Sequence, residues 1–237
     1  MMKCELHAHV KGTSWCALSS PEKVIQDYFD AGYGGVVITN HYYAQCYNDL
    51  LLGKTHKEKI QSFLSVFDQT KKIGSSKNVK VFLGVEVRDN SGTEYSLMGF
   101  NRDFLLNNPP LFELSQKELF TLCEQNGVFM YQTHPFRKGV TPGDPKYMHG
   151  AEYFNGHFHH ENFNVLAERF CEENNLVKLS GTDYHCPNQP ITAGIIIPDS
   201  INDEKELIEY IKSEKCELIQ EEYKYQINRK DYVEEKK

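Results

Sequence analysis

The sequence predicts an α/β fold in which a mainly parallel sheet closes, or nearly closes, into a barrel. Short apolar runs alternate along the chain with segments of helical periodicity, a pattern typical of parallel strands connected by helices. Side chains of the kinds that bind metals follow several of the apolar runs, and an α/β barrel carries its active site at that end of its strands. A doubly wound open sheet is the alternative. The lack of a glycine-rich dinucleotide-binding pattern after the first predicted strand disfavours it.

The first predicted strand, Lys3–Val10, carries two histidines on one face. Side chains alternate along a strand, so His7 and His9 project to the same side. Neutral imidazoles offer nitrogen lone pairs, and two of them side by side can hold one divalent metal ion. A hydrogen-bonded surface pair is the alternative that this stretch alone leaves open.

The predicted helices have apolar residues at helical spacing between capping and breaking residues. Ser20 and Pro21 begin the first helix, as its N-cap and its first helical position, and Gly32 ends it. The other helices are expected at His56–Ile73, Ser115–Asn126, Asn162–Asn174 and Glu204–Lys212.

The remaining apolar runs are short enough to be strands, and several are continuous, as expected for strands buried on both faces. A turn at residues 89–92 is expected to join the second and third of these runs. The runs lie at Gly35–His41, Val79–Val87, Tyr95–Phe100, Val128–His134, Ala151–Asn155, Leu176–Ser180, Ala193–Ile197 and Cys216–Ile219.

Length and composition limit the possible classes of protein. The 237 residues are expected to form one domain, residues 1–237, with a core at 3–220 and a charged tail from Glu221. A formal net charge of −7 argues weakly against binding to nucleic acids or anionic membranes, and no run is long enough to span a membrane. Seven scattered cysteines without a CxxC pair favour reduced thiols and a cytoplasmic location. Cys16 and Cys186 lie near the predicted ligands and are interpreted as rim or buried thiols.

Metal-ligand residues fall at the C-terminal ends of predicted strands, which converge on one face of a barrel. A mixture of imidazoles and carboxylates suits zinc, iron or manganese better than magnesium or calcium. The set is larger than one ion needs, which indicates two or three divalent ions with Glu86 as a candidate bridge. Clustered ions favour hydrolysis, because one lowers the pKa of a bound water and both stabilise phosphoryl oxygens. The predicted ligands are His7, His9, His41, Glu86, His134, Asp183 and His185.

Five short motifs occur along the chain in a fixed order. They are Leu6-His7-Ala8-His9, Ile38-Thr39-Asn40-His41, Gly84-Val85-Glu86, His134-Pro135 and Gly181-Thr182-Asp183-Tyr184-His185. Together they resemble the PHP family, which is named for its polymerase and histidinol phosphatase members, and the resemblance extends over residues 3–220. It implies a distorted (β/α)7 barrel, a cluster of two or three metals, and hydrolysis of phosphoesters by a metal-activated hydroxide.

The resemblance also implies how the ligands are shared. Glu86 and His134 would contribute to a second ion next to a first one. The first ion would be held by His7, His9, Glu86 and Asp183.

A third ion, or the phosphate of the substrate, would be reached by His41 and His185. Glu86, Asp183 and His185 are therefore the catalytic candidates that the resemblance implies.

Four positions depart from the pattern of the family. Glu5 stands where an aspartate often precedes the first histidine, and Asn40 replaces an aspartate before His41. Many members have a further histidine or aspartate after the first pair, where residues 13–16 here are Thr, Ser, Trp and Cys. Some members carry another histidine after the bridging glutamate, where this chain has Asn101. The number of ions therefore stays open between two and three.

Three further residues are candidates for substrate contact. Arg137 begins the loop after His134, and a guanidinium can donate two parallel hydrogen bonds to a phosphate. Arg88 would share the strand face of Glu86, and His157 follows a predicted strand. A surface salt bridge, or an exposed turn in the case of His157, is the alternative for each.

These inferences favour a metal-dependent phosphoesterase that acts on a small phosphorylated substrate. The first alternative is a PHP-like module whose metals serve binding or structure, which the Asn40 substitution motivates. The second is a nuclease, although nucleic acid is an unlikely partner on grounds of charge. Hydrolysis of an amide or similar bond is the third, because related metal barrels share the water-activating chemistry.

Overall fold

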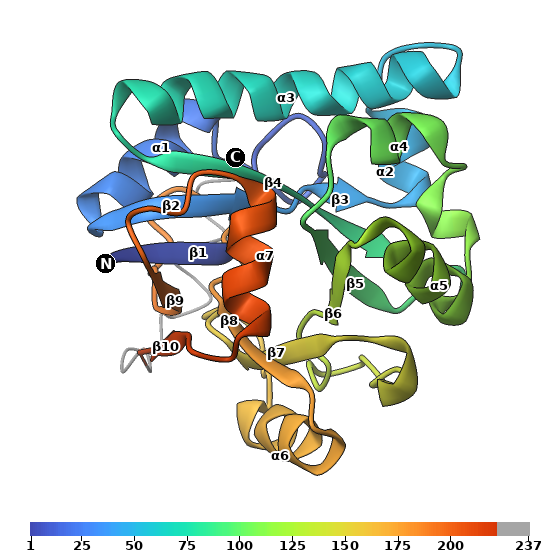
Figure 1. Ribbon diagram of the computed structural model, residues 1–237. Coiled ribbons are helices and arrows are strands. Elements are labelled where there is room, and N and C mark those ends of the chain that lie inside the picture. The colour runs from blue at the N-terminus through green and yellow to red at the C-terminus, as the bar shows by residue number, and fades with distance from the viewer. Residues whose placement is uncertain (222–237) are drawn as a thin grey trace.

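The structure is a computed structural model that describes residues 1–221, so the predicted charged tail lies almost entirely outside the described residues. A strongly curved sheet forms the centre of the molecule, and helices cover its outside (Figure 1). The strands are β1 (Met2–Ala8), β2 (Tyr33–Ile38), β3 (His41–Tyr42), β4 (Lys80–Arg88), β5 (Glu94–Met98), β6 (Phe129–Gln132), β7 (Gly150–Asn155), β8 (Val177–Gly181), β9 (Ala193–Ile197) and β10 (Glu217–Gln220).

The helices agree with the sequence prediction, with two short additions. The helices are α1 (Pro21–Asp30), α2 (Ala44–Asp49), α3 (His56–Ser76), α4 (Arg102–Asn107), α5 (Gln116–Asn126), α6 (Asn164–Asn174) and α7 (Glu204–Lys212), and short 3-10 turns lie at Leu111–Glu113 and Pro145–Tyr147. The side chain of Ser20 caps α1 as predicted, and Thr55 and Ser115 form capping boxes at α3 and α5. Helices α2 and α4 were missed because six residues are too few to show a helical period.

The sheet runs in the order β10-β9-β1-β2-β4-β5-β6-β7-β8, with β3 paired to β4. Its two sides approach each other where β8 ends, because Tyr184 bridges to Ala8 and its carbonyl accepts a hydrogen bond of 2.9 Å from the amide of His9. The expected fold class, a distorted and nearly closed α/β barrel, is therefore confirmed.

The expectation of a mainly parallel sheet is wrong for part of the barrel. β5 is antiparallel to both β4 and β6, and β9 is antiparallel to both β1 and β10. The turn at residues 89–92 is the physical reason at β5, because a tight turn joins only antiparallel strands. Asp89 closes this turn by accepting hydrogen bonds from the amides of Ser91 and Thr93.

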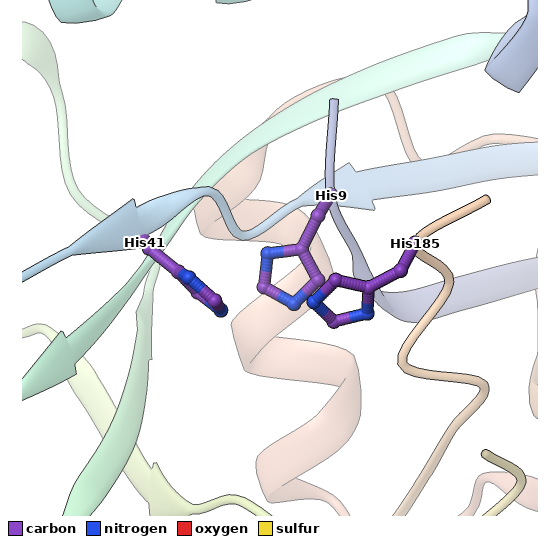
Figure 2. A group of neighbouring side chains, drawn as sticks. All are labelled: His9, His41 and His185. Carbon is purple, nitrogen blue, oxygen red and sulfur yellow. The ribbon is translucent and has the colours of Figure 1, made fainter. Parts of the chain in front are cut away.

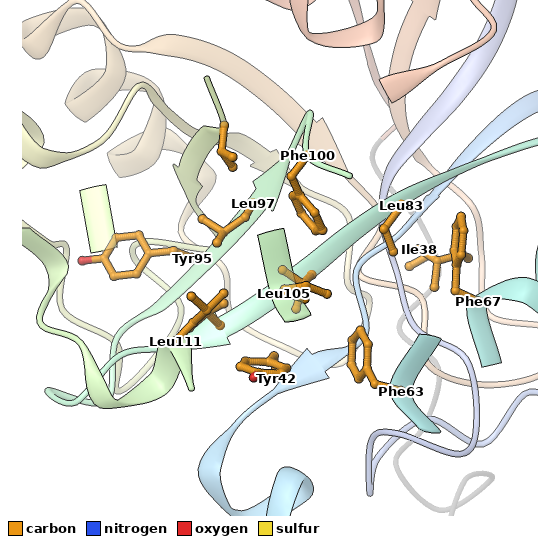
Figure 3. Close-up of a cluster of buried hydrophobic side chains, with 14 of the residues drawn as sticks. Ile38, Tyr42, Phe63, Phe67, Leu83, Tyr95, Leu97, Phe100, Leu105 and Leu111 are labelled. Atoms are coloured by element: carbon orange, nitrogen blue, oxygen red, sulfur yellow. The ribbon is translucent and has the colours of Figure 1, made fainter. Parts of the chain in front are cut away.

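Two buried clusters hold these layers together. The larger lies between the sheet and the helices α1, α3, α4, α5 and α6. In its part beneath α3 and α4, Phe63 and Phe67 pack near Leu83 and Leu105 (Figure 3). The second fills the barrel with strand residues such as Phe82 and is covered by apolar side chains of α7. Burial of apolar side chains on both faces explains why the strands read as continuous apolar runs.

Among residues 1–221, the structure contains no helix that is both long enough and apolar enough to cross a lipid bilayer. The expected cytoplasmic location stays a prediction.

Candidate metal centre

The predicted ligands meet at one end of the barrel, although they come from distant parts of the chain. His9 follows β1, His41 begins β3 and His185 follows β8, and Figure 2 shows their three rings gathered together. The donor atoms of these residues lie within 4.8 Å of one another, and the same holds for two further groups that include His7. Those groups are His7 with His9 and Asp183, and His7 with Glu86 and His134.

The spacing between donor atoms fits shared metal ions better than hydrogen bonds. His7 Nε2 lies 3.3 Å from Glu86 Oε1 and 3.3 Å from Asp183 Oδ1. His9 Nε2 lies 3.2 Å from Asp183 Oδ1, and His134 Nε2 lies 3.3 Å from Glu86 Oε1. Two ligands bound to one ion at about 2.1 Å, with a tetrahedral angle between them, are themselves about 3.4 Å apart. The residues therefore fit divalent ions.

Buried nitrogen atoms without partners support the same conclusion. His7 Nε2 and both ring nitrogens of His9 have no hydrogen-bond partner among the described residues, and both side chains are completely buried. Burial, together with the neighbouring imidazoles of His185 and His41, holds the pKa of His9 well below its usual range. A neutral imidazole keeps the lone pair that a metal needs.

The two carboxylates of the group remain charged in spite of their burial. Burial alone would raise the pKa of Glu86, but the imidazoles of His7, His134 and His41 hold it well below its usual range. The pKa of Asp183 is likewise low, because Arg137 and the neighbouring histidines outweigh its burial. Both side chains can therefore serve as anionic ligands.

Glu152 is a functional candidate that the sequence analysis missed. Its Oε1 accepts a hydrogen bond of 2.6 Å from His7 Nδ1, so the lone pair of His7 is on Nε2, which faces Glu86 and Asp183. Its Oε2 accepts from the backbone amide of His134 at 2.7 Å. A carboxylate behind a histidine ligand fixes the tautomer and orientation of the ring. Glu152 lies inside β7, away from any strand end, so nothing in its local sequence indicated this contact.

Glu94 and Tyr43 are also new to the site. Glu94 Oε2 lies 3.5 Å from His134 Nε2. Asn101 is absent from the site because its side chain caps α4. The hydroxyl of Tyr43 donates to Glu86 Oε2 at 2.7 Å. β5 brings Glu94 to the site because it folds back antiparallel on β4.

The departures Glu5 and Asn40 have structural roles. Glu5 Oε1 accepts from the backbone amides of His7 and Thr182 at 2.8 and 2.9 Å, which ties the ligand-bearing ends of β1 and β8 together. Asn40 Oδ1 accepts from the amide of Val10 at 2.7 Å. Neither change removes a ligand from the site.

Two metal-ligand candidates have unusual backbone conformations. His134 has a backbone φ of 32° and Asp183 one of 54°. Residues other than glycine rarely adopt such positive values. Such conformations cost of the order of 1–3 kcal/mol each and concentrate at functional sites. At His134, the hydrogen bond from its amide to Glu152 helps to hold the conformation.

The candidates for substrate contact line a cavity of about 530 Å³ next to these ligands. Arg137 pairs with Asp183 and donates to Asn155 and Asn162 at 3.2 and 3.1 Å. Arg88 is 48% exposed and forms an ion pair with Glu94. This agrees with the alternative of a surface salt bridge. A larger cavity of about 780 Å³, beside α3 and α4, contains none of the predicted ligands.

His157 is buried and lines the same cavity, with its donor atoms close to those of Asp183 and His185. The alternative of an exposed turn is therefore wrong for His157. Its role in substrate contact stays a prediction.

Gly181 is required for the close approach of β8 to β1. A Cβ at this position would lie 2.6 Å from His7 Cβ and 2.7 Å from Glu152 Oε1. We expect Gly181→Ala to lower the free energy of unfolding by about 1–3 kcal/mol, as overpacking does, and to reduce the bound metal. Urea denaturation and metal analysis measure the two effects. Gly92→Ala is the control for metal content: its φ of 92° makes alanine costly there through backbone strain, but no atom lies within 4 Å of the added Cβ, so it should lose stability and keep its metal. Normal metal content in Gly181→Ala would contradict the expectation.

Comparison with known proteins adds structural relatives. No family model and no curated protein sequence matches the chain. A two-domain protein from Bacteroides vulgatus that contains a predicted PHP-like metal-dependent phosphoesterase is similar with a TM-score of 0.68 and 17% identity, over 93% of this chain and 65% of that chain. PsfC from Pseudomonas syringae gives a TM-score of 0.66 and 16% identity, over 93% and 92% of the two chains.

Endonuclease Q is a further structural relative, with a TM-score of 0.58 and 14% identity, over 90% of this chain and 56% of that chain. Its structure contains a 27-mer duplex with an abasic lesion at the active site. At these identities the similarity concerns the fold, and it confirms the resemblance to the PHP family at that level. The expectation that nucleic acid is an unlikely partner is not supported, because this fold accommodates duplex DNA in endonuclease Q.

Proposed function

We propose that the chain is a metal-dependent hydrolase of phosphoesters that acts on a small phosphorylated metabolite. The observation that supports this most strongly is the convergence of imidazoles and carboxylates at metal-ligand spacing beside a cavity of about 530 Å³. That volume is in the range of small-molecule sites. Divalent ions bound there would lower the pKa of a water molecule to produce the nucleophile and would stabilise phosphoryl oxygens.

Two or three ions of manganese, zinc or iron form part of the proposal. Glu86 lies between the ligand groups, with Oε1 near His7 and His134, and is the proposed bridge from a first ion to a second. Glu94 would be a further ligand of the second ion, beside Glu86 and His134. The first ion would be held by His7, His9, Glu86 and Asp183, and a third would be reached by His41 and His185.

Protein groups around the ions are assigned distinct tasks in this proposal. His185 Nδ1 donates to the backbone carbonyl of Asp183 at 3.0 Å, so Nε2 would be the nitrogen of that ring that binds an ion. Arg137 uses Nε and Nη2 for its protein partners, so its Nη1 group is the proposed donor to a substrate phosphate. Arg88 and His157 would bind the rest of the substrate. Glu86, Asp183 and His185 are the proposed catalytic residues.

A nuclease is the second candidate function. The fold similarity to endonuclease Q favours it. Trp15 is a second support, because this side chain lines the cavity and is 58% exposed. Exposed aromatic rings can stack on unpaired bases. The chain covers only 56% of that endonuclease, so the comparison leaves open whether DNA binding needs further parts.

The test is hydrolysis by chelator-treated protein that is reloaded with manganese, iron or zinc. Substrates are an aryl phosphate, a panel of phosphorylated metabolites, and duplex DNA with an abasic lesion. We expect phosphate release from monoesters that depends on added metal and is lost in His134→Ala together with bound metal. Cleavage of DNA alone would favour the nuclease. Full metal occupancy without hydrolysis of any substrate would favour a binding or structural module.

A further inference from the structure

We propose that Cys16 supplies a thiolate ligand to an ion that it shares with His41 and His185. The Sγ atom of Cys16 lies 3.6 Å from Nδ1 of His41, and Cys16, His41 and His185 line the same cavity. Cys16 thus stands beside two predicted ligands, at the place where the loop after the first histidine pair lacked a histidine or aspartate. Cys16 is exposed and lines the cavity, as expected of a rim thiol, and the proposal adds metal binding to that position.

The distance from sulfur to nitrogen fits two ligands of one ion. Zinc binds thiolate sulfur at about 2.3 Å and imidazole nitrogen at about 2.0–2.1 Å, with tetrahedral angles. Two such ligands are then about 3.5 Å apart. The observed 3.6 Å agrees with this edge of a tetrahedron.

The two ring nitrogens of His41 face different groups. Nδ1 lies 3.6 Å from Cys16 Sγ, and Nε2 lies 3.0 Å from Glu86 Oε2. Nδ1 is therefore the nitrogen through which the ring would share an ion with the sulfur. A metal on one ring nitrogen and a carboxylate on the other is a common arrangement for histidine ligands.

A buried imidazole without partners provides a second, independent observation. The ring of His9 lies between those of His41 and His185, with centroids 4.4 and 4.2 Å away (Figure 2). Both its nitrogens lack a hydrogen-bond partner among the described residues. Donor atoms of these three histidines lie within 4.8 Å of one another, so Cys16 joins a group that already fits an ion.

The loop that carries Cys16 is attached on both sides to the residues that carry the histidines. The amide of His41 donates to Ser14 Oγ at 3.0 Å, and the amide of Leu18 donates to the carbonyl of His185 at 2.7 Å. Cys16 lies midway between these two attachments. Its position is thus fixed relative to both rings, which a ligand requires.

A thiolate is a soft ligand, so this position should select zinc over manganese or magnesium. The carboxylate-rich position near Glu86 carries no sulfur and would remain open to the harder ions. The proposal therefore assigns different metal preferences to two positions of one centre: zinc beside Cys16, and a harder ion such as manganese beside Glu86.

Cobalt is the probe that tests this proposal, because a bond from thiolate to Co²⁺ gives an intense charge-transfer absorption in the near ultraviolet. The metal-free protein is titrated with Co²⁺ alone, and absorption and bound metal are measured together. We expect the band in the wild type, its complete loss in Cys16→Ser, and its retention in Cys186→Ala. Cys186 is the matched control, because it lines the same cavity but contacts Gln189.

Cys16→His separates loss of a ligand from loss of folding. It should keep the full cobalt content, because imidazole replaces thiolate, yet show no sulfur band. Persistence of the band in Cys16→Ser, or its absence from the wild type, would overturn the proposal. These readouts do not depend on turnover, so they stay informative if the proposed phosphoesterase activity is not found.

Discussion

Replacing Glu86 with glutamine is expected to lower kcat/KM for phosphoester hydrolysis by about 10³-fold, equivalent to about 4 kcal/mol of transition-state stabilisation. The amide keeps the volume of the side chain but loses the charge that faces His7 and His134. Thr133 and Tyr43 now donate hydrogen bonds of 2.7 Å to the two carboxylate oxygens, and the amide NH2 group, which replaces one of these oxygens, cannot accept one of them. Steady-state kinetics with saturating metal, and metal content after gel filtration, measure the effect.

Glu172→Gln is the matched control, because Glu172 pairs with Lys178 far from the ligands and is 55% exposed. It should retain normal activity and metal content. Circular dichroism shows whether Glu86→Gln is folded. A folded Glu86→Gln protein with wild-type kcat/KM and wild-type metal content would remove Glu86 from the centre.

Replacing Glu152 with glutamine is expected to weaken metal binding by about 10–100-fold, the range found when the partner behind a metal ligand is removed. Glutamine has one acceptor oxygen, whereas Glu152 accepts from His7, from the amide of His134 and from Asn155. His7 would lose the contact that keeps its lone pair on Nε2. Competition with a chromogenic chelator measures the affinity, and activity should recover at high metal concentration.

Glu124→Gln is the control for this variant, because Glu124 makes the same 2.6 Å contact to a histidine, His149, outside the site. Its exposed fraction is 58%, so its loss should leave metal affinity unchanged. Equal metal affinity in Glu152→Gln and the wild type would show that Glu152 has no influence on the ligands. Recovery of activity by excess metal distinguishes weakened binding from a direct role in hydrolysis.

The sequence was most informative where a residue and its task belong to one short segment. His7 and His9 share a face because strand side chains alternate, and His185 follows a strand that ends at the same edge of the barrel. The extents of α5 and α7 also agree with the prediction. Ser115 and Gly127 cap the two ends of α5, and Asp203 caps the start of α7, so the residues that end each helix lie next to it in the sequence. Strand ends were placed less well, since His134 lies two residues beyond β6.

Other parts of the site depend on contacts between segments that no local pattern connects. Glu152 reaches His7 across 145 positions of the chain, and Cys16 reaches His41 across 25. Glu94 approaches His134 only because β5 is antiparallel, against the expectation of a parallel sheet. Asn101, which stands where some members of the family carry a histidine, caps a helix instead.

Local sequence patterns indicated the α/β class, the positions of most helices and strands, and a first set of histidines and carboxylates as candidates for metal binding. Propensity, periodicity and capping act over a few neighbouring residues, so a single segment carries them. Three features became visible only in the tertiary structure: the carboxylates that hydrogen-bond to the histidines, the strands that run antiparallel, and the position of Cys16 beside His41. Closure of the barrel sets these contacts, because it brings together the ends of strands that are far apart along the chain.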